Sequence, residues 1–381
     1  MLLKVEEKDN TFHIYGCSKL SESICPKTME KTSQVYQKRE RIIRDLPILG
    51  KAVYIHLTTR QFKTSSGYFW EQFSFSRKRG RFTYRYEEYI FESCKGADIS
   101  YVAKQQGLNH DTVSGIFHAY SKKKLKDRKA ILSVTRLGID EIALKKGHKE
   151  YVCVLVDLDT HEVVELLPQR DKAYLIGYFK GLGASFCSQV KIFCSDMWQG
   201  YLSLAEEVFP QATIIIDRFH LMNYLQKGVE NARRSLRNKF KEADELKGIR
   251  WTLLKKAEHL KRDEKEHLES IFKQPKYKLL KETYEAKEEL RHIFDHIPFQ
   301  KAGEILEEWV KKVKEKKLRH LFSFSKKIQN YWKKIIPYFQ HRLTTSPVEG
   351  INNKIKAIKR RAFGYLNFDN FRRRVLIEFL E

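Results

Sequence analysis

Short apolar runs separated by polar and turn residues open the chain, and this spacing predicts strands. One such run covers Ala52 to Leu57, and Leu46 to Gly50 carries a turn signal with proline and glycine. We therefore expect a small β module over residues 1–78.

The apolar spacing changes to a helical period after Tyr84. It predicts helices over Tyr84 to Cys94, over Ile99 to Leu108, and from Asn109 or His110 to Tyr120. Ala103 lies four positions before Gly107, so a small residue allows two helices to approach and a glycine allows the turn between them. This spacing predicts a helix-turn-helix, although an ordinary helical hairpin has the same pattern.

The third helix would be the recognition helix of such a motif. Side chains at its start would then read base edges, and the candidates are Asn109, His110, Thr112 and Ser114. The segment from Ser121 to Ala130 holds six basic residues and one acidic residue, which predicts an exposed linker that crosses phosphates. We expect this DNA-binding domain and its linker to occupy residues 79–130.

From Leu137 onward, strand and helix signals alternate. They predict three hairpin-linked strands, the first two antiparallel across Lys145 to His148, and then helix, strand, helix and strand. The ranges are Leu137–Leu144, Tyr151–Leu158 and Glu162–Leu167, then Asp171–Leu182, Val190–Cys194, Trp198–Val208 and Ala212–Ile216. This is the order of a ribonuclease-H-like α/β core, in which helices flank a mixed sheet.

The long segment that follows has a different character. Between Asp217 and Glu349 lie 131 residues with Lys/Glu-rich helical patterns, such as Glu304 to Arg319, and almost no strand signal. We interpret it as an all-helical insertion, with a final helix starting at Pro347. The predicted division is residues 131–220 for the first part of the core, 221–340 for the insertion, and 341–381 for the closing helix and a basic C-terminal tail.

The charge of the chain points to its partner. Of 381 residues, 42% are hydrophobic and 13% aromatic, which excludes a disordered chain, while 73 Lys and Arg face 48 Asp and Glu for a net charge of +25. Such a field attracts polyanions, of which nucleic acid is the first candidate and an anionic membrane the rival. No apolar run approaches the ~20 residues of a spanning helix. We expect a cytoplasmic, nucleoid-associated protein without a membrane partner, whose six cysteines, lacking a C-x-x-C pair, are reduced.

Three carboxylates lie at the ends of predicted elements in this basic chain. Asp140 is on the first strand of the core, Asp196 follows the fourth, and Glu349 is on the closing helix. Phosphodiester cleavage without a covalent intermediate uses two hard cations about 4 Å apart. Because magnesium prefers oxygen ligands, carboxylates at strand ends are suitable ligands. The pattern therefore predicts two Mg²⁺ or Mn²⁺ ions, with Asp140 bridging both and Asp196 and Glu349 each holding one.

Each carboxylate also has a structural interpretation. Asp140 can be a solvated strand end, Asp196 can cap the helix near Trp198, and Glu349 completes a capping box that begins at Ser346. Singly, these interpretations are as good as catalysis. The three carboxylates in this order of elements favour a metal site.

A D-x-x-H unit, Asp217 and His220, follows the last core strand, 21 residues after Asp196. A lone histidine here is more often structural, and magnesium does not favour it as a ligand. His220 could instead donate a hydrogen bond to the scissile phosphate, with Asp217 fixing its orientation.

The chain resembles insertion-sequence transposases of the ISL-three family, a branch of the DDE transposases. The resemblance runs from Arg44-Asp45-Leu46-Pro47 to the C-terminal tail. Its most specific parts are Gly138 to Glu141, Phe209 to Leu221, and Val348 to Lys356 running into Arg360 to Tyr365. It implies a ribonuclease-H-like domain with a helical insertion before the glutamate, a triad of Asp140, Asp196 and Glu349, and an accessory role for Asp217 and His220. Asp217 as the second aspartate of the triad stays open, although the 21-residue offset favours Asp196.

The chain departs from the resemblance near its N-terminus. The family has a four-cysteine zinc ribbon beginning Cys-Pro-x-Cys, whereas Cys25-Pro26-Lys27-Thr28 keeps one cysteine and Phe62 to Gly67 has none. A structural zinc needs four ligands. We therefore expect no zinc, and a β module held by apolar packing or partly disordered.

The predicted function is that of a DNA transposase that binds terminal inverted repeats, hydrolyses a strand at the element's end and transfers it to target DNA. A basic stretch of the closing helix would grip the phosphates beside the scissile bond, and it comprises Lys354, Lys356, Lys359, Arg360 and Arg361. Pairing of two ends predicts a homodimer or larger assembly on double-stranded DNA. The alternatives are a non-catalytic DNA-binding regulator derived from a transposase and a ribonuclease-H-like nuclease of repair or resolution.

Overall fold

The computed structural model describes residues 1–126, 133–143, 151–240, 243–343, 346–362, 364–365 and 367–380, with 346 and 347 as backbone only. The chain forms two compact units. Unit 1 comprises Met1–Asp127, Arg361–Gly364 and Leu380–Glu381, and unit 2 comprises Arg128–Arg360 and Tyr365–Phe379.

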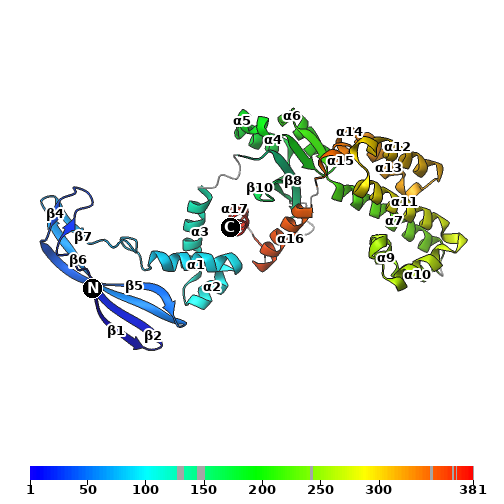
Figure 1. The fold of residues 1–381 in the computed structure, drawn as a ribbon. Coiled ribbons are helices and arrows are strands. Elements are labelled where there is room, and N and C mark those ends of the chain that lie inside the picture. Colours follow the sequence, from blue (N-terminus) through cyan, green and yellow to red (C-terminus); the bar gives the residue numbers. More distant parts are fainter. Residues whose placement is uncertain are drawn as a thin grey trace. The chain divides into compact units, whose positions relative to one another are not determined.

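Unit 1 begins with strands, as the apolar pattern predicts. Its main sheet has the order β1-β2-β6-β5, with β7 also paired to β6 (Figure 1). The pairing of β2 with β6 is parallel and the other pairings are antiparallel. A separate ribbon pairs β3 with β4. The strands are β1 (Leu2–Lys8), β2 (Thr11–Cys17), β3 (Ser23–Ile24), β4 (Lys31–Thr32), β5 (Val35–Ile48), β6 (Lys51–Thr64) and β7 (Gly67–Trp70).

Three helices complete unit 1: α1 (Tyr84–Gly96), α2 (Ile99–Gln106) and α3 (His110–Lys126). Gly107 ends α2 with φ 57° and ψ 37°, a left-handed conformation that favours glycine. Ala103 and Val113 are buried between the helices, so the predicted packing of the turn is present. The prediction of a linker from Ser121 was wrong up to Lys126, because α3 continues through these residues; 127–130 lie outside the described residues.

Unit 2 contains a five-stranded sheet of order β10-β9-β8-β11-β12 (Figure 1). Antiparallel pairing joins β8, β9 and β10, whereas β11 is parallel to both β8 and β12. The strands occupy the predicted segments: β8 (Arg136–Ala143), β9 (Tyr151–Asp157), β10 (Val163–Leu167), β11 (Ile192–Ser195) and β12 (Thr213–Ile216). The predicted turn at Lys145 to His148 lies outside the described residues.

Helices cover both faces of this sheet, which makes the unit a mixed α/β structure. On one face, α4 (Lys172–Gly181), α5 (Ala184–Gln189) and α6 (Gln199–Val208) pack on a core that includes the buried Leu137, Phe179 and Phe193. Residues alternate between faces along a strand, so Gly138 and Asp140 face the other side.

The second face receives α16 (Ser346–Arg361) and α17 (Phe368–Glu378). Arg372 of α17 donates from Nε to Oε1 of the buried Glu165 on β10 at 2.6 Å, which joins the helix to the sheet edge. The sequence pattern predicts neither α17 nor α5, and it makes α16 the final helix, which was wrong.

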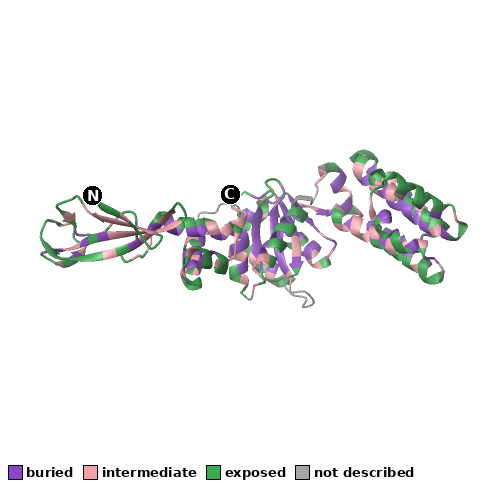
Figure 2. Ribbon diagram, turned by 90° about the horizontal axis from the view of Figure 1, so that it is seen from below, coloured by how far each residue is buried: buried purple, intermediate pink, exposed green. Residues whose placement is uncertain are grey.

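Residues 218–341 are helical, without a strand among those that are described. Their apolar faces form a core of their own, with Tyr277, Phe294 and Trp309 fully buried while the outer faces are exposed (Figure 2). Both ends of the segment lie at β12, because α7 starts two residues after it and α14 and α15 pack on it. The helices are α7 (Arg218–Lys239), α8 (Glu245–Gly248), α9 (Arg250–Leu254), α10 (Arg262–Phe272), α11 (Lys278–His296), α12 (Phe299–Glu315), α13 (Phe322–Asn330), α14 (Trp332–Ile335) and α15 (Pro337–His341). No helix in the described part of the chain is both long and apolar enough to cross a bilayer.

Candidate active site and nucleic-acid surfaces

Strand register brings two of the predicted acidic residues side by side in unit 2. Gly138 on β8 pairs with Cys194 on β11, so Asp140 and Asp196 lie two residues further along neighbouring parallel strands. Ser195 pairs with Ile216, and the N–H of Asp217 donates to the Ser195 carbonyl oxygen at 2.8 Å. The three aspartates are therefore carried by three adjacent strands.

His220 lies among these carboxylates on the first turn of α7. Its Nε2 is 3.7 Å from Asp140 Oδ1 and 3.7 Å from Asp217 Oδ2. Burial lowers the pKa of His220, but the hydrogen bond to Asp140 and the charges of Asp217, Asp140 and Asp196 together raise it above its ordinary value. The imidazole of His220 thus lies within an acidic cluster that favours its protonated form.

Local backbone turns hold the aspartates. Asp196 Oδ1 accepts from the N–H of Trp198 at 2.8 Å, and Asp217 Oδ1 accepts from the N–H of Phe219 at 2.8 Å. Asp217 is thereby the N-cap of α7, whereas α6 has Trp198 as its N-cap and no side-chain cap bond. Burial raises the pKa of Asp196, against the hydrogen bond from Trp198 and the charge of His220. A buried carboxylate with a raised pKa gains from a neighbouring cation.

Asn352 on α16 also enters the cluster, although the sequence analysis did not include it. Its Nδ2 donates to Asp140 Oδ2 at 2.5 Å, its side chain is 5% exposed, and its Oδ1 is buried without a hydrogen-bond partner. Asn352 follows Glu349 by three residues, and residues three apart share a helix face. That spacing was the signal that could have identified it.

Glu349 itself occupies the first turn of α16 and is exposed. Within the described residues, no three His, Cys, Asp or Glu side chains are arranged to hold a metal ion as they stand. The donor chemistry nevertheless suits Mg²⁺ or Mn²⁺, since Asp140, Asp196 and Asp217 offer carboxylate oxygens. The side chains of Ser346 and Pro347 in the predicted capping box lie outside the described residues.

The basic side chains of α16 differ in their surroundings. Lys356 and Arg360 are exposed, and Lys354 Nζ lies 4.2 Å from the centre of the Phe379 ring. Lys359 is half-buried and donates to the Ala143 carbonyl oxygen at 3.0 Å. Arg361, which falls in unit 1, donates to the Lys95 carbonyl oxygen at 3.3 Å.

The predicted base-reading residues lie at the start of α3. Asn109 Oδ1 accepts from the N–H of Thr112 at 2.8 Å, so Asn109 caps the helix. His110 is exposed, while Thr112 and Ser114 are half-buried.

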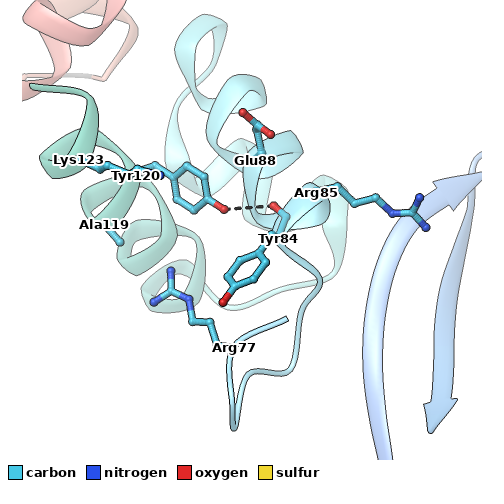
Figure 3. Close-up of a pocket in the computed structure, with 7 residues that line it drawn as sticks. All are labelled: Arg77, Tyr84, Arg85, Glu88, Ala119, Tyr120 and Lys123. Atoms are coloured by element: carbon cyan, nitrogen blue, oxygen red, sulfur yellow. Dashed lines mark hydrogen bonds between the residues drawn. The ribbon is translucent and has the colours of Figure 1, made fainter. Parts of the chain in front are cut away.

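A hollow of about 800 Å³ opens between α1 and α3 of the same motif (Figure 3). Arg77 and Lys123 line it, and the Tyr120 hydroxyl closes one side by donating to the Tyr84 carbonyl oxygen at 3.1 Å. Arg85 points away toward β5, where its Nε donates to Asp45 at 2.7 Å. The lining is of mixed charge, because Glu88 also lines the hollow and Arg77 pairs with Glu87 at 3.0 Å.

Three family models match the chain. Residues 137–375, more than half of it, match a transposase model of the DDE class of ISL3, and residues 71–121 match the helix-turn-helix domain of transposase family ISL3. Residues 21–63 match the zinc-finger of transposase IS204/IS1001/IS1096/IS1165.

Curated relatives show the same similarity. The transposase for insertion sequence element IS1001 of Bordetella parapertussis is 26% identical over 375 residues, covering 96% of this chain and 91% of the relative. The transposase for insertion sequence element IS1557 of Mycobacterium tuberculosis is 27% identical over 259 residues, covering 61% of this chain and 57% of the relative.

The zinc-finger match contradicts the expectation of no zinc, because it points to zinc binding in residues 21–63. Cys25 has surroundings that suit a metal ligand: hydrogen bonds from the Thr28 side chain and from the backbone of Thr28 and Lys27 lower the pKa of its thiol. It packs against Phe62 and Phe69. The other described side chains do not complete a ligand set around it. The expectation of no zinc rested on the missing cysteines alone, whereas the family model matches the sequence of residues 21–63 as a whole.

Proposed function

Because the chain belongs to the ISL3 family of transposases, we propose that it binds the terminal inverted repeats of an insertion sequence and catalyses metal-dependent strand cleavage and strand transfer. The observation that carries this proposal is the convergence of Asp140 on β8, Asp196 after β11, Asp217 after β12 and His220 on the first turn of α7. A sheet of this order with helices on both faces is typical of a ribonuclease-H-like core.

The proposed division of the chain follows its elements. Residues 1–78 form the N-terminal β module and 79–130 the helix-turn-helix with its basic extension. Residues 131–220 and 341–381 form the ribonuclease-H-like domain, and 221–340 are a helical insertion. The insertion leaves and rejoins the core at β12, next to the acidic cluster, which supports this division.

Asp140, Asp196 and Glu349 would hold two Mg²⁺ or Mn²⁺ ions. When bound, the ions supply activation of the attacking oxygen and stabilisation of the leaving oxygen. Asn352 orients the Asp140 carboxylate through its Nδ2 hydrogen bond and excludes water from that side. Glu349 lies about one helical turn before Asn352. To bind an ion together with Asp140, its exposed side chain would turn toward the sheet.

His220 is the residue proposed to contact the scissile phosphate. The surrounding carboxylates raise its pKa, and an imidazole donates a hydrogen bond from one ring nitrogen when neutral and from both when protonated. Asp217 holds it from the N-cap of α7, which fixes the ring beside Asp140.

Two basic surfaces are proposed to hold DNA. The exposed Lys356 and Arg360, with Lys354, would contact phosphates beside the cleavage site, with Lys359 and Arg361 at the end of the helix. The start of α3 would enter the major groove, where His110 is the exposed base-reading candidate, and Asn109 would fix the first turn of the helix. Because two element ends must be paired, we propose a homodimer or larger assembly.

The test is a cleavage assay on a duplex that carries the flanking inverted repeat. Wild-type protein should nick the strand at the element's end only with Mg²⁺ or Mn²⁺, while Asp140→Asn should bind the same duplex without nicking it. Specific binding without any cleavage by the wild type would favour the non-catalytic regulator. Equal cleavage of unrelated duplexes would favour a repair or resolution nuclease.

A further inference from the structure

The outer part of the β5–β6–β7 sheet in unit 1 has two different faces. Phe62 and Phe69 lie on one face, 0% and 8% exposed, with ring centroids 5.7 Å apart and Cys25 packed against them. Side chains alternate along each strand, so the neighbours of these phenylalanines point to the opposite side. Among the described residues, Tyr36, Lys63 and Tyr68 on that opposite side are exposed.

Two tyrosines lie open on this second face. Tyr36 is 60% exposed and Tyr68 is 53% exposed, although their ring centroids are 4.5 Å apart at an interplanar angle of 50°. Large rings that touch each other yet stay in solvent offer apolar faces to a partner. We name this surface the tyrosine face, and its residues are Tyr36, Gln37, Arg39, Gln61, Lys63, Tyr68 and Trp70.

The tyrosine face is positively charged. Arg39 lies over the Trp70 ring with its guanidinium carbon 3.9 Å from the ring centre, and Lys63 is exposed opposite Tyr68 in the strand register. The seven residues include two cations and no carboxylate. Within the described residues, neither Arg39 nor Lys63 forms an ion pair.

The reverse side of the same strands shows the contrast. There Arg60 is paired with Glu71 at 2.5 Å, and His56 Nδ1 lies 2.9 Å from Glu40. The Arg60 cation on that side is paired within the protein, whereas Arg39 and Lys63 of the tyrosine face are available to an external anion. Exposed aromatic rings beside unpaired cations fit a polyanion that also has flat π faces.

A DNA duplex does not satisfy this chemistry, because its bases are stacked on each other and only their edges are reachable. An unpaired strand presents base faces to aromatic rings and phosphates to cations. We propose that the tyrosine face binds single-stranded DNA, with bases stacked on Tyr36 and Tyr68 and phosphates held by Arg39 and Lys63. This rests on the proposed function only in that the substrate is DNA, and it adds a surface for unpaired strands.

The test measures binding of the full chain to a fluorescent oligothymidine and to a terminal-repeat duplex. Tyr36→Ala and Tyr68→Ala should each weaken oligothymidine binding by about 5-fold or more, the equivalent of the ~1–3 kcal/mol of one base–aromatic stack. Tyr36→Phe and Tyr68→Phe should retain it, because stacking needs the ring and not the hydroxyl. Lys63→Gln should lower the salt slope by ~0.7.

Phe299→Ala, which removes a 41% exposed aromatic ring from α12, is the matched control and should leave oligothymidine binding unchanged. Thermal unfolding of each variant checks that it is folded. Unchanged oligothymidine affinity in the folded Tyr36→Ala/Tyr68→Ala double variant would overturn the proposal. A change in the oligomeric mass of this variant without a change in its oligothymidine affinity would also overturn it. If the wild-type protein neither binds nor cleaves the terminal-repeat duplex, the result counts against the proposed function instead.

Discussion

Replacing Asn352 by alanine tests whether the Asp140 carboxylate must be held in place. The structure gives a buried amide, 5% exposed, that donates to Asp140 Oδ2 at 2.5 Å. A hydrogen bond to a charged acceptor contributes about 1.5–3 kcal/mol, and loss of a group that orients a metal ligand costs ~10–100-fold in metal affinity or activity. The two ranges agree, because each ~1.4 kcal/mol is a factor of ten.

We therefore expect Asn352→Ala to lower the rate of repeat cleavage about 10–100-fold. Mn²⁺ affinity, followed by electron paramagnetic resonance on the DNA-bound protein, should fall in parallel, while affinity for the duplex stays constant. Raising the metal concentration should recover part of the rate. Asn353→Ala, which changes the exposed neighbour on the same helix, is the control and should behave as wild type. Wild-type cleavage together with wild-type Mn²⁺ affinity in Asn352→Ala would refute the reasoning.

Three further predictions follow from other parts of unit 2. In a binding assay at several salt concentrations, Lys356→Ala should weaken binding to all duplex sequences and reduce the salt slope by about one unit; an unchanged slope excludes that phosphate contact. Arg372→Ala removes the guanidinium from the buried Glu165, which keeps the hydrogen bond from the Leu166 N–H, so the free energy of unfolding in urea should fall by about 1–3 kcal/mol, and unchanged stability contradicts the contribution of this pair. Glu230 on α7 has its pKa lowered to about 2, chiefly by a hydrogen bond from Arg233, so its stabilising contribution is present above the unfolded-state value of 4.5 and is lost as the pH falls toward 2. Glu230→Gln should flatten the acid loss of stability over that range, and identical pH profiles of unfolding for variant and wild type would show that the pair contributes nothing.

The sheet of unit 2 was predictable because its strands are buried on both faces. The runs from Tyr151 to Val156 and from Ile214 to Ile216 are apolar without interruption, and the turns between elements carry clear polar signals. Chain order then placed Asp140 and Asp196 on strands that the register joins. The helix-turn-helix was predictable from Gly107, because the left-handed conformation at the end of α2 favours glycine.

Contacts between distant segments were not predictable from the sequence. Asn352 reaches Asp140 across 212 positions, and no local pattern encodes that meeting. The sequence analysis did not predict α17 because it interpreted Phe368–Glu378 as part of a basic tail. In the structure, Arg372 of this helix binds the buried Glu165. The expectation of no zinc was wrong because it considered only the cysteines, whereas residues 21–63 as a whole match the zinc-finger of the family.

The helices α16 and α17, which cover one face of the sheet, are synthesised last, and this affects the incomplete chain during translation. A nascent chain that has emerged from the ribosome as far as α15 carries the helix-turn-helix and the aspartates of the acidic cluster, but neither Asn352 nor Glu349. Its sheet face around Asp140 stays uncovered, so on the proposed function it would bind element ends without cutting them. Interrupted products would thus compete with finished molecules, and premature termination would act as a brake on the mobility of the element.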